Sequence, residues 1–145
     1  MQDVIRREVT INASKEIVYE AIANPEKVVL WFPHAIEGKY EVGENPILSF
    51  GKDGKAQIHI VDAKPYEYFA YRWVPGRNHF IGDVLSVPHT LVEFKIQKVD
   101  GEKCTVTVIE SGFAELPIEM AENAFKQNSG GWEFMLGRLN KYFQQ

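Results

Sequence analysis

The sequence predicts an α+β fold in which an antiparallel sheet packs against a long C-terminal helix. Runs rich in β-branched and aromatic residues are separated by turn signals such as "VGENP", "GKDGK" and "VDGEK". Strands that meet through short turns pair antiparallel. The segment 118–143 instead carries apolar residues at helical spacing. These two observations place about seven strands before one long helix.

The first strand is expected at Val4–Ile11, where "VIRREVTI" is β-branched and partly alternating. Six further runs predict strands at Ile36–Tyr40, Ile47–Phe50, Ala56–Ala63, Tyr68–Val74, Thr90–Val99 and Cys104–Phe113. The segment Pro75–His89 is too long for a tight hairpin. Its apolar residues are typical of a lid over an opening or of a contact with a partner.

Two short helices are expected between the first and second strands. Ser14 can cap the first helix, and an apolar stripe at helical spacing follows it. Asn24 can cap a second helix, because Pro25 fits the first helical position, where its missing N–H is not needed.

The C-terminal helix has a Gly130–Gly131 step near its middle. Each glycine there costs roughly 0.5–1 kcal/mol relative to alanine, so a reason for the missing side chains is expected. The glycines would let the helix pass close to the sheet, leave space for a ligand, or mark a kink without function. Asn128 is a polar residue on the same apolar stripe, between Phe125 and Trp132.

Composition excludes several classes of protein. The 145 residues fit one domain, 1–145, with 45% hydrophobic residues. A net charge of −4 gives no footprint for nucleic acid. No run approaches the ~20 apolar residues of a membrane span, and the N-terminus does not resemble a secretory signal. The single cysteine, Cys104, cannot close an intrachain disulfide. A cytoplasmic protein is therefore expected.

Strand alternation sends one carboxylate to the apolar side of the sheet. The residues expected on the inner face are Ala56, Ile58, Ile60, Phe69, Tyr71, Trp73, Val92, Phe94, Ile96, Val106, Val108 and Glu110. A buried carboxylate is costly unless it is paired, so Glu110 should have hydrogen-bonding partners or remain protonated. Two interpretations stay open: a polar anchor or general acid–base for a ligand, or a glutamate at a cavity mouth bonded to a Tyr or Trp.

Catalytic and metal motifs are not found in the sequence. The four histidines show no metal-ligand spacing, so no metal or other cofactor is expected. His34 is the histidine expected near a cavity entrance. No nucleophile elbow or phosphate loop is present, and one carboxylate is weak evidence for catalysis. No catalytic residue is assigned, and binding is favoured over enzymatic activity.

Four stretches carry a resemblance to a known family. "NASKEIVYEAIANPEKVVLWF" resembles the family's first helical segment, ending in Trp31, and "KPYEYFAYRW" resembles its proline-led strand, ending in Trp73. "CTVTVIESGF" and "GGWEFMLGRL" resemble its last strand and last helix. The chain is similar to the START-like superfamily, also called SRPBCC. Within it, the chain resembles the activator of heat shock protein 90 ATPase homologue family.

The resemblance implies a helix-grip (START/Bet v-like) fold, in which a curved sheet grips the C-terminal helix around an apolar cavity. The implied function is binding of a small hydrophobic or aromatic molecule. Two alternatives remain: an interaction protein that assists a chaperone ATPase in the stress response, and a cyclase-, aromatase- or hydrolase-like enzyme. The last would need a second ionisable group facing Glu110.

The expected partners and site follow from these inferences. We expect a small hydrophobic ligand or a chaperone as partner, no nucleic acid and no membrane, and a monomer or homodimer, with an exposed Phe134 as a dimer contact. The expected ligand-binding residues are Trp31, Phe32, Phe69, Tyr71, Trp73, Phe94, Glu110, Asn128, Gly131 and Trp132.

Overall fold

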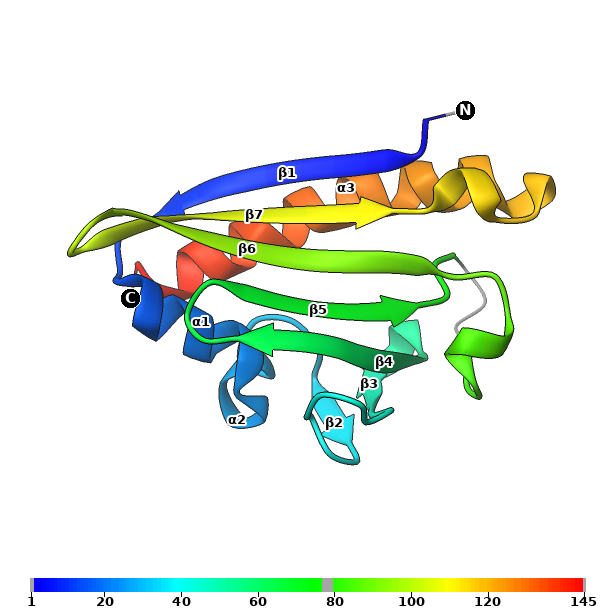
Figure 1. Ribbon diagram of the computed structural model, residues 1–145, viewed down its shortest axis with the longest axis horizontal. Helices are drawn as coiled ribbons and strands as arrows, with labels where there is room; N and C mark the ends of the chain where they lie inside the picture. Colours follow the sequence, from blue (N-terminus) through cyan, green and yellow to red (C-terminus); the bar gives the residue numbers. More distant parts are fainter. Residues whose placement is uncertain (1, 77–79, 145) are drawn as a thin grey trace.

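The computed structural model describes residues 2–76 and 80–144, arranged as one antiparallel sheet with helices packed against it (Figure 1). The seven strands lie in the order β1-β7-β6-β5-β4-β3-β2. Their bounds are β1 Val4–Ile11, β2 Ala35–Glu37, β3 Ile47–Ser49, β4 Lys55–Lys64, β5 Tyr68–Trp73, β6 Thr90–Asp100 and β7 Lys103–Ser111. The helices are α1 Lys15–Ala23, α2 Pro25–Val28 and α3 Ile118–Tyr142. The predicted helix-grip fold is confirmed.

Two strands end at least two residues earlier than predicted, and glycines with positive φ explain both ends. β2 ends at Glu37 because Gly38 has a φ of +96°, and the chain then turns Tyr40 into the core. β7 ends at Ser111 because Gly112 has a φ of +103°. Such backbone angles suit glycine and interrupt a strand.

The predicted helix caps are present. The Ser14 side chain accepts a hydrogen bond from the Ile17 N–H at 3.5 Å, and that of Asn24 accepts one from the Glu26 N–H at 2.9 Å. Pro25 occupies the first helical position of α2. Both short helices therefore begin where capping chemistry predicts.

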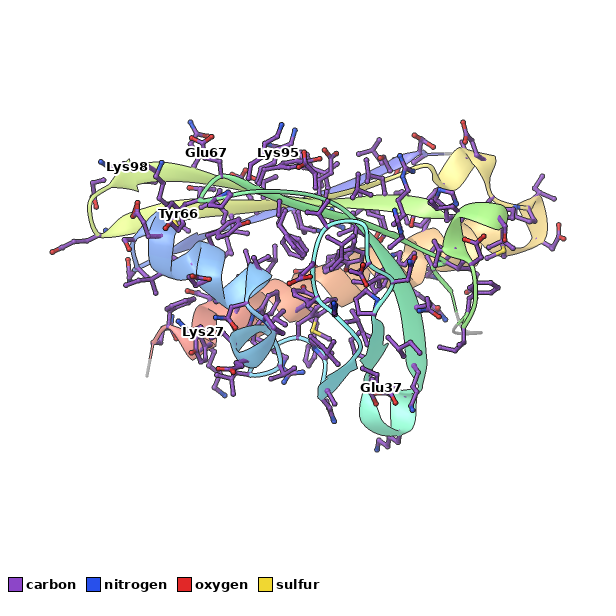
Figure 2. The ribbon with its side chains drawn as sticks, turned by 60° about the horizontal axis from the view of Figure 1, so that its bottom comes forward. Lys27, Glu37, Tyr66, Glu67, Lys95 and Lys98 are labelled. Atoms are coloured by element: carbon purple, nitrogen blue, oxygen red, sulfur yellow. The ribbon has the colours of Figure 1, made fainter. Side chains whose placement is uncertain are left out.

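All three helices lie on one side of the sheet (Figure 2). The other side carries polar residues, and Lys95 of β6 points away from the helices there. Strand alternation is as predicted, because the inner-face residues of β4, β6 and β7 are buried. The buried residues of α3 are Ala121, Ala124, Trp132, Leu136 and Leu139. None of the helices in the described part of the chain has the length and hydropathy needed to cross a bilayer.

The long segment between β5 and β6 is tied to β4. The Gln57 N–H donates to the carbonyl of Phe80 at 2.9 Å, and the Gly82 N–H donates to Gln57 Oε1 at 3.1 Å. Val84 is fully buried in a short 3-10 helix that contacts β4 and β5. Leu85 stays half exposed. Residues 77–79, with His79 among them, lie outside the described residues.

Candidate functional site: a buried glutamate beside an aromatic cavity

Glu110 of β7 is fully buried and accepts four hydrogen bonds from side chains. Oε1 accepts from Trp132 Nε1 at 2.7 Å and from Asn128 Nδ2 at 2.8 Å, both on α3. Oε2 accepts from Trp73 Nε1 of β5 at 2.9 Å and from Thr90 Oγ1 of β6 at 2.6 Å. One carboxylate therefore connects three neighbouring strands to the C-terminal helix.

These contacts satisfy the carboxylate without a counter-charge. A carboxylate has about four lone-pair sites, and each oxygen of Glu110 receives two donors. Hydrogen bonds to a charged group are worth about 1.5–3 kcal/mol each, enough to offset a large part of the cost of burial. The expected hydrogen-bonding partners are present, tryptophans among them. The position at a cavity mouth is wrong, because Glu110 lies in the interior.

The two tryptophans that bind Glu110 stack on each other. Their ring centroids are 5.7 Å apart with an interplanar angle of 29°. Phe32, which follows α2, lies 5.6 Å from the Trp132 ring at 31°. Phe50, after β3, meets Phe32 edge-on at 5.5 Å. These four rings form a continuous aromatic wall where α3 faces the sheet.

A cavity of about 220 Å³ lies against this wall. Its polar side chains beyond the tryptophans are Asn128 and Asp53, and its remaining lining is apolar. The lining residues are Phe32, Phe50, Asp53, Ala56, Trp73, Val74, Pro75, Gly76, Asn128, Gly131, Trp132 and Met135. An apolar cavity with a few polar groups is typical of a small-molecule site.

Half of the residues proposed from the sequence line this cavity, namely Phe32, Trp73, Asn128, Gly131 and Trp132. The other half lie elsewhere. Trp31, Tyr71 and Phe94 are buried in the core, where Trp31 Nε1 donates to the carbonyl of Ala21 at 2.7 Å. Phe69 lines a second cavity, of about 380 Å³, between α1 and the β4–β5 turn. Glu110 lies behind the tryptophans and is not a lining residue.

The cavity also contains residues that sequence reasoning missed. Met135 lies one helical turn beyond Gly131, and Ala56 is on the predicted inner face of β4, so spacing alone could have found both. Phe50 and Asp53 lie in the turn between β3 and β4. No periodicity applies to a turn, so the sequence gives no signal for them.

The glycines of α3 face open space. A Cβ built on Gly131 meets no atom within 4 Å, and the same holds at Gly130. Close approach of helix and sheet is therefore not the reason for either glycine. Gly131 lines the cavity, whereas Gly130 does not. The missing side chain at Gly131 keeps the cavity open.

Among the described residues, the titratable side chain that lines this cavity is that of Asp53, which is exposed. His34 donates its backbone N–H to the Ser49 carbonyl and packs its ring against Gly51, but it does not line the cavity. The described residues contain no cluster of His, Cys, Asp and Glu side chains suited to a metal. Burial raises the pKa of the Tyr71 hydroxyl well above its ordinary value, with smaller contributions from Tyr40 and Glu110.

Residues 12–144 match the model of a family described as Activator of Hsp90 ATPase homolog 1-like protein. The chain belongs to this family. The predicted relationship to the activator homologues within the START-like superfamily is confirmed. A comparison with curated proteins finds no match.

Several solved structures have the same fold as this chain. DynU16, a protein of the dynemicin biosynthetic locus, is 25% identical to this chain, with a TM-score of 0.79. The match covers 100% of this chain and 48% of DynU16, so the chain spans about half the length of DynU16. The Aha1 dimer from Colwellia psychrerythraea is 17% identical, with a TM-score of 0.75 and coverage of 98% and 96%. An HSP90 activator from Plasmodium falciparum is 11% identical, with a TM-score of 0.70 and coverage of 95% and 94%. The last two likenesses show the fold alone.

Proposed function

We propose that the protein binds a small hydrophobic or aromatic molecule in the cavity between the sheet and α3. The observation that carries this proposal is the aromatic wall of Phe32, Phe50, Trp73 and Trp132 bordering a cavity that Gly131 leaves open. Such walls offer stacking and edge contacts to a planar ligand. Membership of a helix-grip family supports the proposal at the level of the fold.

The cavity volume limits the ligand to a small one. An apolar cavity of about 150 Å³ takes up benzene, so about 220 Å³ has room for one ring with substituents or two fused rings. Typical drug-sized ligands occupy pockets of about 300–1,000 Å³. We therefore infer a mono- or bicyclic aromatic molecule.

In this proposal Glu110 positions the wall and does not touch the ligand. Its hydrogen bonds fix the indole nitrogens of Trp73 and Trp132, so their rings are held in place before a ligand arrives. Rings that are already fixed lose little side-chain entropy on binding, which favours affinity. This role differs from that of a polar anchor, and the burial of Glu110 behind the tryptophans supports it.

Interaction with a chaperone ATPase is the second candidate function. Its support is the family and the fold shared with an HSP90 activator. Addition of the protein to Hsp90 should then raise the rate of ATP hydrolysis. An unchanged rate at saturating protein would remove this candidate. The third alternative, an enzyme, would need a second ionisable group facing Glu110. The described residues that hydrogen-bond to Glu110 are not ionisable; they are Trp73, Thr90, Asn128 and Trp132.

Nitrogen-15 NMR tests the binding proposal directly, because the chain has three tryptophans and therefore three indole N–H signals. Titration with indole should shift the signals of Trp73 and Trp132 much more than that of Trp31, which points to Ala21. Equal small shifts of all three, or none at millimolar indole, would contradict binding in this cavity.

A further inference from the structure

We propose that the cavity selects aromatic ligands that carry an N–H or O–H group and that this group donates a hydrogen bond to Oδ1 of Asn128. The inference rests on the proposed binding function and adds the chemical class of the ligand. It follows from counting which polar atoms of the cavity wall are already occupied.

Glu110 occupies both indole donors of the described cavity lining and one of the two amide N–H groups of Asn128. Three lining residues carry donor groups, namely Trp73, Trp132 and Asn128. Each directs its N–H to the carboxylate of Glu110, at 2.9, 2.7 and 2.8 Å respectively. The other described lining side chains are those of Phe, Ala, Val, Pro, Met and Asp, and glycine has none. The side-chain donor of the described lining that remains for a ligand is therefore the second Nδ2–H of Asn128.

The acceptor on the same amide is Oδ1 of Asn128. Glu110 fixes the amide orientation, because the reverse orientation would place Oδ1 against Oε1 and bring two acceptors together. In the observed orientation Oδ1 accepts no hydrogen bond from a described residue. Oδ1 is also accessible to solvent. Among the described residues, the one fully buried side-chain polar atom without a hydrogen-bond partner is the Tyr71 hydroxyl, so the unpartnered Oδ1 of Asn128 is not fully buried.

The position of Asn128 suits contact with a ligand in the cavity. It lies three residues before Gly131 on α3, hence on the same face and one turn away. Both residues line the cavity, and Gly131 leaves open the space beside it. A planar ligand against the tryptophans therefore lies within reach of the amide.

Covering this oxygen without a hydrogen bond weakens binding. A ligand that displaces water from Oδ1 must replace the lost hydrogen bond, or the acceptor is left unsatisfied. The oxygen of an aromatic ring ether is a weak acceptor, so it gains little from the second Nδ2–H of Asn128. The structure therefore favours aromatic amines, phenols and N–H heterocycles over aromatic hydrocarbons and ring ethers of the same size. From the usual cost of an unsatisfied acceptor, we expect a preference of about tenfold in Kd.

Asp53 is a second acceptor at the cavity, and the experiment must distinguish its contribution to ligand selectivity from that of Asn128. Its carboxylate is exposed and forms no hydrogen bond or ion pair with the described residues. Because water solvates an exposed carboxylate, its contribution to selectivity should be small.

The test compares indole with benzofuran, which has the same shape and an ether oxygen in place of the N–H. Their Kd values are measured by titration calorimetry on the wild-type chain, on Asn128→Leu and on Asp53→Ala. We expect indole to bind about tenfold more tightly to wild type and to Asp53→Ala, and the ratio to fall to one or below in Asn128→Leu. A thermal melt of each variant accompanies the titrations.

Each other outcome has a definite meaning. Equal affinities in wild type overturn the donor inference while leaving the binding function intact. A tenfold ratio that disappears in Asp53→Ala overturns the assignment to Asn128. Binding of neither compound contradicts the proposed function itself. If Asn128→Leu fails to fold, the wild-type and Asp53→Ala ratios still decide the inference.

Discussion

Glu110 and Trp132 are joined by a 2.7 Å hydrogen bond from the indole Nε1 to Oε1, in a region where both side chains are buried. This bond ties β7 to α3, and the same carboxylate also holds Trp73 of β5. The packing of the long helix on the sheet and the orientation of the aromatic wall therefore depend on one side chain.

Replacing Glu110 by glutamine should destabilise the fold. The amide has one oxygen and one NH₂ group, so at least one of the four donors loses its acceptor and the NH₂ faces other donors. We expect a loss of about 2–4 kcal/mol in the free energy of unfolding, measured by urea titration at pH 7. Glu102→Gln, at an exposed turn, is the matched control and should change stability by less than about 0.5 kcal/mol. A similar small change for Glu110→Gln would contradict the structural role.

Trp132→Ala should cost about 3–5 kcal/mol, because it removes a buried ring in contact with Phe32, Trp73 and Phe94. Phe134→Ala is the control on the same helix, since Phe134 is 64% exposed. Chemical denaturation of the two variants should differ by several kcal/mol. If Trp132→Ala melted within a degree or two of wild type, Trp132 would not be a core residue.

The sequence predicted the fold well because the pattern of buried residues is regular. Alternation along β5 placed Phe69 and Tyr71 inside, and both are fully buried. Capping residues and a proline set the starts of α1 and α2. The strand ends that differed by more than one residue lie before Gly38 and Gly112, where backbone conformation and not periodicity decides.

The candidate site was only partly predictable. Alternation assigns a side chain to a face, but it does not say whether that face meets a cavity or a packed core. Tyr71 and Phe94 are therefore on the predicted face and yet lie in the core. The four partners of Glu110 come from three other elements, so their convergence depends on strand order and helix placement.

Stability should fall as the pH rises above about 9. Burial, followed by the charge of Glu16, raises the pKa of the Cys104 thiol from 9.0 to about 11. The unfolded chain then loses this proton at a lower pH than the folded chain, so the contribution to stability is complete below pH 9 and is lost as the pH rises through 11. Burial raises the pKa values of Tyr40 and Tyr71 in the same direction.

Urea midpoints between pH 7 and 10.5 measure this effect. We expect a flat region up to about pH 8.5 and a decline above it. Cys104→Ala should reduce the slope between pH 8.5 and 9.5, where the tyrosines of the unfolded chain are still largely protonated. A urea midpoint that stays constant or increases as the pH is raised to 10.5 would contradict the buried, neutral state of Cys104, Tyr40 and Tyr71.

Association through Phe134 stays a prediction. Its side chain lies about 200° around the helix from Trp132 and is exposed, as are Ile81 and Leu85 on the long segment after β5. Light scattering at tens of micromolar protein should then give a dimer mass that Phe134→Ser returns to the monomer. A monomer mass for wild type removes this prediction.

The most direct measurement of cavity binding compares Gly131→Leu with Gly130→Leu. Both glycines lie side by side on α3 with open space around a new Cβ, so both variants should fold and gain helix propensity. Only the side chain at position 131 enters the cavity. We predict that Gly131→Leu weakens the binding of indole at least tenfold, by calorimetry, while Gly130→Leu binds like wild type. Unchanged affinity in a folded Gly131→Leu protein would contradict a ligand site between the sheet and α3.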